Sequence, residues 1–183
     1  MNIAVYCGST GGNKGIFIEK ALELGKAMGG RGDTLVYGGS NTGMMGAIAD
    51  SVLKNGGKVI GVVPDVPVIK ARTHQGVNEL ILTKTMAERK SVMIDRAEAF
   101  VAMPGGIGTL DEITEILSLS SLGIVNGPIV FYDVEGYFTD IREMLETVVK
   151  NGFGRPEYFN KVLFSDDPEE IAEFIHKRER LYL

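Results

Sequence analysis

The chain has 183 residues, of which 44% are hydrophobic and 23% are charged, a balance typical of a water-soluble globular protein. The formal charge is −5 and the lysines and arginines form no cluster, so binding to a nucleic-acid backbone is not expected. No apolar run reaches the roughly 18 residues of a membrane helix, and no segment has the pattern of a signal peptide. The sequence contains only one cysteine, which is compatible with a reducing compartment. Together these features indicate a cytoplasmic protein without a membrane partner.

Apolar runs without polar alternation recur along the chain and predict buried strands, and segments of helical periodicity separate them. In chain order, the first half predicts a strand at Asn2–Cys7, a helix from Ile16 to Met28, a strand at Thr34–Tyr37, a helix at Met44–Leu53, and strands at Lys58–Val63 and Glu79–Thr83. The second half predicts a helix at Met86–Ala97, a strand at Ala99–Met103, a helix ending near Leu122, a strand at Pro128–Tyr132, a helix at Tyr137–Lys150, a strand at Val162–Phe164 and a helix at Pro168–Lys177. The stretch from Asp65 to Gly76 has no clear period and is predicted to be a loop over the functional site.

This alternation of strands and helices determines the expected fold class. Strands that are apolar throughout are typical of a parallel sheet covered on both faces. We therefore expect a doubly wound, Rossmann-like α/β fold of about seven parallel strands with helices on both faces. Because the chain has no repeat, low-complexity tract or linker, residues 1–183 are expected to form a single nucleotide-monophosphate-binding domain.

Three of the predicted strands end in glycine-rich loops, at Gly8–Gly12, Gly38–Gly43 and Pro104–Gly108. Ligands of such sheets bind beyond the carboxyl ends of the strands, and a helix that starts there offers free N–H groups to an anion. Glycine turns also serve tight packing alone, but together the loops favour a site for one phosphate. They match neither the dinucleotide fingerprint nor the Walker pattern, so neither a nicotinamide cofactor nor triphosphate hydrolysis is expected.

The loop Pro104–Glu112 reads PGGIGTLDE, and a predicted helix carries Met86–Lys90, MAERK. The first resembles the P-G-G-x-G-T-x-x-E signature of the LONELY GUY family of cytokinin riboside 5′-monophosphate phosphoribohydrolases. The second resembles the family's M-x-x-R-K motif, and Glu112 follows Arg89 by the family's spacing of 23 positions. Older labels describe the same family as lysine decarboxylases. Two positions depart from the family pattern, with Ala87 in place of a histidine and Leu119 in place of a tryptophan.

The resemblance implies hydrolysis of the N-glycosidic bond of adenosine 5′-monophosphates, N6-modified ones included, to free base and ribose 5-phosphate. Glu112 is then expected to stabilise an oxocarbenium-like transition state attacked by water, and Arg89 to bind substrate and keep Glu112 ionised. The expected substrate contacts are Ser9, Gly39, Ser40, Met86, Lys90, Gly105, Gly106, Gly108 and Thr109. Neither a metal nor a cofactor is expected. The family also implies a homodimer whose partner subunit helps to form the base pocket, with which the apolar residues Leu117, Leu119 and Leu122 are compatible.

Each of these residues also has an ordinary structural explanation. Thr109 and Glu112 match a capping box, in which the glutamate satisfies backbone N–H groups at a helix start. Arg89 and Lys90 are compatible with a solvated helix face. The spacing of Met86 and Met93 favours core packing, His74 is expected in a mobile loop, and Cys7 is expected to be a small packed side chain.

Two other functions stay open at this point. A non-catalytic nucleotide-binding module would explain why Ala87 and Leu119 replace the residues of the family pattern. Decarboxylation would need a lysine that forms a Schiff base with pyridoxal phosphate, and no lysine here has such a context. The two histidines and the distant cysteine form no metal-ligand pattern.

Overall fold

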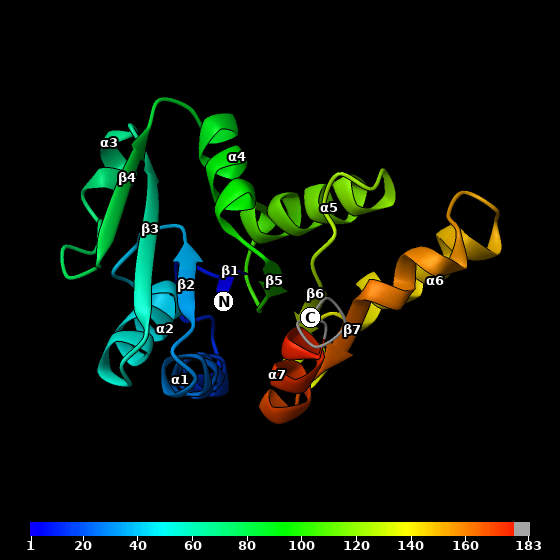
Figure 1. The fold of residues 1–183 in the computed structure, drawn as a ribbon, viewed down its shortest axis with the longest axis horizontal. Helices are drawn as coiled ribbons and strands as arrows, with labels where there is room; N and C mark the ends of the chain where they lie inside the picture. The colour runs from blue at the N-terminus through cyan, green and yellow to red at the C-terminus, as the bar shows by residue number, and fades with distance from the viewer. Residues whose placement is uncertain (178–183) are drawn as a thin grey trace.

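The computed structural model describes residues 1–177, Tyr158 by its backbone alone, as a sheet between two layers of helices (Figure 1). The strands are β1 (Asn2–Tyr6), β2 (Thr34–Tyr37), β3 (Lys58–Pro64), β4 (Glu79–Thr83), β5 (Ala99–Ala102), β6 (Ile129–Tyr132) and β7 (Val162–Ser165). The helices are α1 (Gly15–Gly30), α2 (Gly43–Lys54), α3 (Pro67–Lys70), α4 (Met86–Arg96), α5 (Ile107–Ser121), α6 (Thr139–Lys150) and α7 (Pro168–His176), with two 3-10 turns, η1 (Val134–Gly136) and η2 (Pro156–Lys161). Among the helices of this described part, none is long and apolar enough to cross a membrane.

The seven strands form one parallel sheet in the order β4-β3-β2-β1-β5-β6-β7. In the central strand β1, Ile3 pairs with Leu35 of β2 and with Ala99 of β5. Residues 3–6 are at most 2% exposed, because helices cover both faces of the sheet at its centre. This explains why the central strands are apolar throughout, whereas most of the edge strand β4 is exposed. The predicted doubly wound α/β fold is confirmed.

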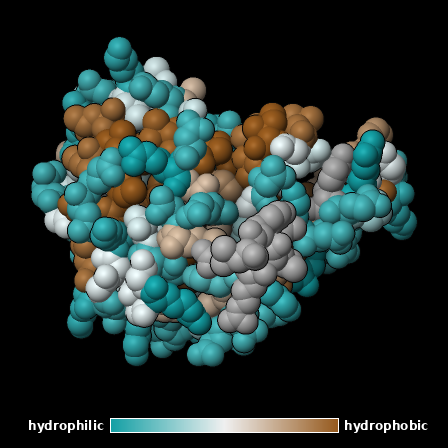
Figure 2. All heavy atoms as spheres, viewed as in Figure 1, coloured by the Kyte–Doolittle hydropathy of each residue, from teal (hydrophilic) through white to brown (hydrophobic). Residues whose placement is uncertain are grey.

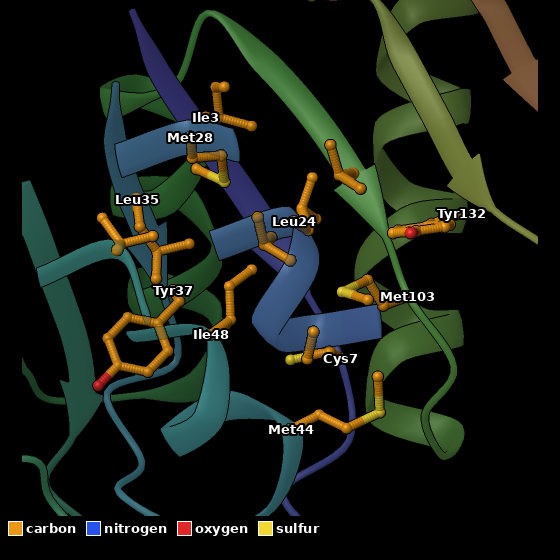
Figure 3. Packing of buried hydrophobic residues seen from close by; sticks show 14 of the residues in the cluster. Ile3, Cys7, Leu24, Met28, Leu35, Tyr37, Met44, Ile48, Met103 and Tyr132 are labelled. Atoms are coloured by element: carbon orange, nitrogen blue, oxygen red, sulfur yellow. The ribbon is translucent and has the colours of Figure 1, made fainter. Parts of the chain in front are cut away.

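Two hydrophobic clusters, one on each face of the sheet, hold the helices in place. On one face, Leu24 and Met28 of α1 and Ile48 of α2 pack against the sheet (Figure 3). On the other face, Met93 of α4 and Ile113 of α5 are fully buried. Burial of each such side chain contributes roughly 1.5–3 kcal/mol to folding. Helices α4 and α5 are therefore held on the same face, side by side.

The strand order reverses at β1, and this brings two glycine loops together. The chain adds β2, β3 and β4 on one side of β1 and then returns to place β5 on the other side. The Gly8 N–H after β1 donates to the Pro104 carbonyl after β5 at 3.0 Å. A side chain at Gly43 would lie 2.4 Å from the Ser9 backbone, so glycine is needed for this close approach. Backbone segments therefore approach one another closely at the switch point predicted to bind a ligand.

The stretch from Asp65 to Gly76, predicted to be a loop, contains the single helical turn α3. Pro67 occupies its first position, where a proline stabilises a helix start. The segment after α3 is tied to the β2 exit, where the Asn41 N–H donates to the Arg72 carbonyl at 2.8 Å. His74, expected in a mobile loop, lies with Nε2 2.9 Å from a carboxylate oxygen of Asp50. The segment covers the carboxyl edge of the sheet as predicted, but with helical structure of its own.

The helix predicted from Tyr137 begins two residues later, at Thr139. The reason is the preceding turn η1, in which Glu135 adopts a φ of 54° and Gly136 a φ of 73°. A left-handed backbone at two successive residues cannot continue into an α-helix. Tyr137 therefore belongs to the connection between β6 and α6.

Candidate active site

A cavity of about 370 Å³ opens beyond the carboxyl ends of β1, β2 and β5. Five separate parts of the chain line it, so it exists only in the folded protein. The lining residues are Cys7, Gly8, Ser9, Gly38, Ser40, Met45, Val68, Ile69, Arg72, Met86, Arg89, Gly106, Gly108, Thr109 and Glu112.

Two buried charges of opposite sign face each other in this cavity. Arg89 Nη1 donates to Glu112 Oε1 at 2.6 Å, and Arg89 Nε donates to the Val62 carbonyl at 3.0 Å. A side chain at Gly38 would lie 2.3 Å from Arg89 Nη2, so this glycine makes room for the guanidinium. Arg89 is 5% exposed and Glu112 is 6% exposed. The alternative that Arg89 lies on a solvated helix face is therefore wrong.

The start of α5 shows that Glu112 does not cap its own helix. Gly106 is the N-cap residue of α5, without a side-chain cap, and Glu112 lies more than one turn further along. The capping pattern occurs instead at α4, where the Glu88 N–H donates to the Thr85 hydroxyl and Glu88 Oε2 accepts from the Lys84 N–H. The capping explanation of Glu112 is wrong, and its carboxylate is directed to Arg89.

The protonation of the buried groups follows from their surroundings. Burial raises the pKa of Glu112 above its usual value of 4.5, although Arg89 acts in the opposite direction. Burial and the nearby charge of Glu112 also raise the pKa of the Cys7 thiol, which keeps it protonated at neutral pH. Cys7 is 2% exposed, which confirms the prediction of a packed side chain. Glu112 is thus the titratable carboxylate of this cavity.

The first turn of α5 presents backbone N–H groups at the cavity. The N–H groups of residues 106–109 have no acceptor within the helix, and the first one inside the helical pattern is Leu110, which donates to the Gly106 carbonyl at 3.2 Å. Gly106, Gly108 and Thr109 line the cavity. Free N–H groups together with the positive end of the helix dipole attract a phosphate without any basic side chain.

Known proteins resemble this chain over most of its length. The family model described as "Possible lysine decarboxylase" matches residues 45–175. The cytokinin riboside 5′-monophosphate phosphoribohydrolase LOG1 of Arabidopsis thaliana is 35% identical over 93% of this chain and 80% of its own length. The Mycobacterium tuberculosis enzyme of the same name is 37% identical over 92% of this chain and 89% of its own length. The chain belongs to the LONELY GUY family.

Solved structures similar to this LONELY GUY chain share its fold. A molybdenum cofactor binding protein from Rippkaea orientalis has a TM-score of 0.73 at 21% identity, covering 97% of this chain and 96% of its own. A molybdenum cofactor carrier protein from Chlamydomonas reinhardtii has a TM-score of 0.67 at 21% identity, covering 96% and 98%. At this level of identity, the likeness concerns the backbone only.

The structure brings most of the predicted site residues of this LONELY GUY chain together in the cavity. Those that line it are Ser9, Ser40, Met86, Arg89, Gly106, Gly108, Thr109 and Glu112. Three others lie outside the lining, namely Gly39, Lys90 and Gly105. Met93 is fully buried, as its predicted place in the core requires, whereas Met86 is 45% exposed, so core packing is the wrong explanation for Met86.

Lys90 points away from the cavity, toward α5. Its ammonium group lies 3.0 Å from a carboxylate oxygen of Asp111 and 2.9 Å from one of Glu115. These two carboxylates raise the pKa of Lys90, so it keeps its charge. The solvated-face alternative therefore fails for Lys90 as well, because its side chain is held between two helices.

Five lining residues were neither predicted as site residues nor part of the predicted glycine loops: Cys7, Met45, Val68, Ile69 and Arg72. The last three come from α3 and the residues after it, where the sequence shows no period. Only the expectation that this stretch covers the site pointed to them. Arg72 adds a second guanidinium to the cavity besides Arg89.

The two departures from the family pattern lie outside the cavity lining. Ala87 is exposed on α4 and Leu119 is half-buried on α5. No group of three or more His, Cys, Asp or Glu side chains within residues 1–177 is placed to hold a metal ion.

Proposed function

We propose that this protein hydrolyses the N-glycosidic bond of adenosine 5′-monophosphates, N6-modified ones included, to free base and ribose 5-phosphate. The observation that carries the proposal is the buried ion pair of Arg89 and Glu112 beside the free N–H groups of α5, in one cavity. Membership of the LONELY GUY family supports it, because relatives covering most of the chain bear this activity in their names.

The chemistry needs a negative charge next to the anomeric carbon. As the C1′–N9 bond breaks, positive charge develops on C1′ and the ring oxygen, and a carboxylate stabilises it. Water then forms the new C1′–O bond, and one of its protons ends on the departing base. Glu112 is the group proposed to stabilise the cation and to orient or deprotonate the water. Positioned acid–base help of this kind is worth about 10²–10⁴ in rate. Arg89 favours the charged form of Glu112 against the effect of burial and holds the carboxylate in place.

The glycine loop explains why the substrate would be a monophosphate. Hydrogen bonds to a charged group are worth roughly 1.5–3 kcal/mol each, and Gly106, Gly108 and Thr109 offer several to one phosphate. Ser9 and Ser40 line the same cavity and are proposed to contact the phosphate or ribose. Removing the phosphate from the substrate should therefore weaken binding strongly.

We also propose a homodimer whose partner subunit completes the base pocket. Hydrophobic side chains gather in the upper half of Figure 2, over β4, α4 and α5. Met86 is 45% exposed at the cavity, and Leu122 and Ile124 after α5 are 70% and 66% exposed. Exposed apolar surface of this kind is typical of an interface.

The expected cytoplasmic location is compatible with the single free thiol, Cys7.

The test is to incubate the protein with AMP and with an N6-alkylated AMP, and to measure released base and ribose 5-phosphate. We expect release from the nucleotides, little from adenosine, and none from Glu112→Gln. If the wild-type protein binds the nucleotides without releasing base, the proposal is overturned in favour of a non-catalytic nucleotide-binding module. Decarboxylation is disfavoured, because no lysine is among the described residues that line the cavity.

A further inference from the structure

Tyr137 reaches the glycine loop from a distant part of the chain. Its hydroxyl donates a hydrogen bond to the Gly105 carbonyl at 2.5 Å. Tyr137 lies in the connection between β6 and α6, and it does not line the cavity. Any effect on a ligand must therefore pass through Gly105.

The direction of the Gly105 carbonyl fixes the direction of the Gly106 N–H group. In a trans peptide, the carbonyl of one residue and the N–H of the next point in opposite directions from one rigid plane. Holding the Gly105 carbonyl against Tyr137 therefore directs the Gly106 N–H away from Tyr137. Gly106 is the N-cap residue of α5 and lines the cavity.

The neighbouring carbonyls of the loop are engaged as well. The Pro104 carbonyl accepts from the Gly8 N–H at 3.0 Å, and the Gly106 carbonyl accepts from the Leu110 N–H at 3.2 Å. With Tyr137 on Gly105, each of these three carbonyl oxygens has a donor. A carbonyl oxygen that turned toward the cavity would repel a phosphate, so these bonds keep the loop selective for an anion.

Tyr137 is itself held in place by the surrounding structure. Its ring packs edge-on against Phe17 of α1 at 5.9 Å and against Phe138 at 5.0 Å between centroids. The turn before it has Glu135 in a left-handed conformation, and Lys14 forms an ion pair with that glutamate at 2.5 Å. A left-handed backbone at a residue other than glycine costs free energy that the surrounding structure must offset, and such residues cluster at functional sites.

We propose that Tyr137 is a positioning residue of the phosphate loop, which fixes the Gly105–Gly106 peptide so that its N–H faces the substrate phosphate. This inference rests on the proposed function for the identity of the ligand. It assigns to the β6–α6 connection a part in substrate binding that the cavity lining alone does not reveal.

The test compares two substitutions that each remove one hydroxyl. Tyr137→Phe loses the bond to Gly105. Tyr132→Phe is the matched control, because the Tyr132 hydroxyl is buried in β6 without a hydrogen-bond partner among the described residues. Binding of ribose 5-phosphate is measured by calorimetry, adenosine is the probe without phosphate, and the melting temperature of each variant is recorded.

We expect Tyr137→Phe to raise the Kd for ribose 5-phosphate by roughly three- to tenfold, the loss of one hydrogen bond, with adenosine binding unchanged. The KM for AMP should rise by the same factor, while kcat stays within about twofold. Tyr132→Phe should leave all these constants unchanged. Tyr137→Leu, which removes the ring as well, should weaken ribose 5-phosphate binding further.

The outcomes separate this inference from the proposed function. If the wild-type protein binds ribose 5-phosphate but releases no base, hydrolysis fails while the positioning role can still be measured by binding. If Tyr137→Phe binds ribose 5-phosphate as tightly as the wild type, the positioning role is overturned even when hydrolysis is observed. Equal losses for ribose 5-phosphate and adenosine would also overturn it, because they would indicate a general structural effect.

Discussion

Arg89 of α4 and Glu112 of α5 form an ion pair 2.6 Å long, with side chains 6% and 7% exposed. Arg89 precedes β5 in the chain and Glu112 follows it, and the two side chains meet only because α4 and α5 lie side by side. The pair has two consequences that can be measured separately, one for stability and one for the proposed reaction.

Arg89→Met should strongly destabilise the protein. It leaves the Glu112 carboxylate buried without a partner, and breaking a buried pair from one side costs about 3–5 kcal/mol of unfolding free energy. The double variant Arg89→Met/Glu112→Leu, which removes both charges, should recover much of this loss. Urea unfolding of the single and double variants provides the measurement, and equal stability of the two would contradict the argument. Both variants should be inactive.

The raised pKa of Glu112 predicts a pH dependence of the rate. The proposed reaction needs the carboxylate, so kcat should fall on the acid side with a midpoint above the usual value of 4.5. A rate that stays constant down to about pH 4 would count against Glu112 as the reacting group.

The same shift predicts the sign of a stability effect. A raised pKa means that the folded state holds the proton of Glu112 more tightly than the unfolded chain does. The stabilisation is therefore fully present below pH 4.5 and is lost as the pH rises through the folded-state pKa. Relative to Glu112→Gln, the wild type should lose unfolding free energy over this range. Denaturant unfolding at several pH values measures the difference, and an opposite slope would refute the shift.

Two glycines of the same loop should respond differently to alanine. A Cβ at Gly105 would lie 2.2 Å from Thr109 Oγ1 and 2.9 Å from the Gly8 nitrogen, so Gly105→Ala should destabilise the protein. A Cβ at Gly108 would meet nothing within 4 Å, so Gly108→Ala should keep its melting temperature. Because Gly108 lines the cavity, the methyl group should nevertheless raise the KM for AMP. An unchanged KM for AMP in Gly108→Ala would indicate that the phosphate binds elsewhere.

Lys90→Met should affect stability rather than substrate binding. Lys90 joins α4 to Asp111 and Glu115 of α5, and partly exposed ion pairs of this kind contribute roughly 0.2–1 kcal/mol each. The KM for AMP should stay within about twofold of the wild type. Asp111→Asn, which weakens the same contact from the other side, is the matched control for stability. A large rise in the KM for AMP in Lys90→Met, but not in Asp111→Asn, would instead support the substrate contact of Lys90 that the sequence predicted.

The fold could be predicted from the sequence to a large extent, for a physical reason. A strand buried on both faces must be apolar throughout, so runs such as Thr34–Tyr37 and Ala99–Met103 are visible without a structure. The turn η1 was not visible, because the left-handed conformation of Glu135 depends on its surroundings rather than on its type. That turn displaced the start of α6 and placed Tyr137 beside Gly105.

The site was only partly predictable, because it depends on contacts between distant residues. Taken alone, the local pattern at Arg89 favoured a solvated helix face and the pattern at Glu112 favoured a helix cap. Only the resemblance to the family, through its glycine signature and the spacing of the two residues, placed both in one site. Lys90 was grouped with Arg89 although successive helical residues point about 100° apart, so one enters the cavity and the other does not. Arg72 was missed because the position of α3 depends on backbone bonds to the β2 exit.

The place of Arg89 and Glu112 in the strand order has a practical consequence. Strands β1 to β4 form one contiguous side of the sheet and β5 to β7 the other, and each side carries one charge of the pair. A cut between α4 and β5 would therefore yield two fragments, neither of which holds both groups. Reassociation of such fragments would bring Arg89 and Glu112 together again, so under the proposed function base release would report complementation of the split protein.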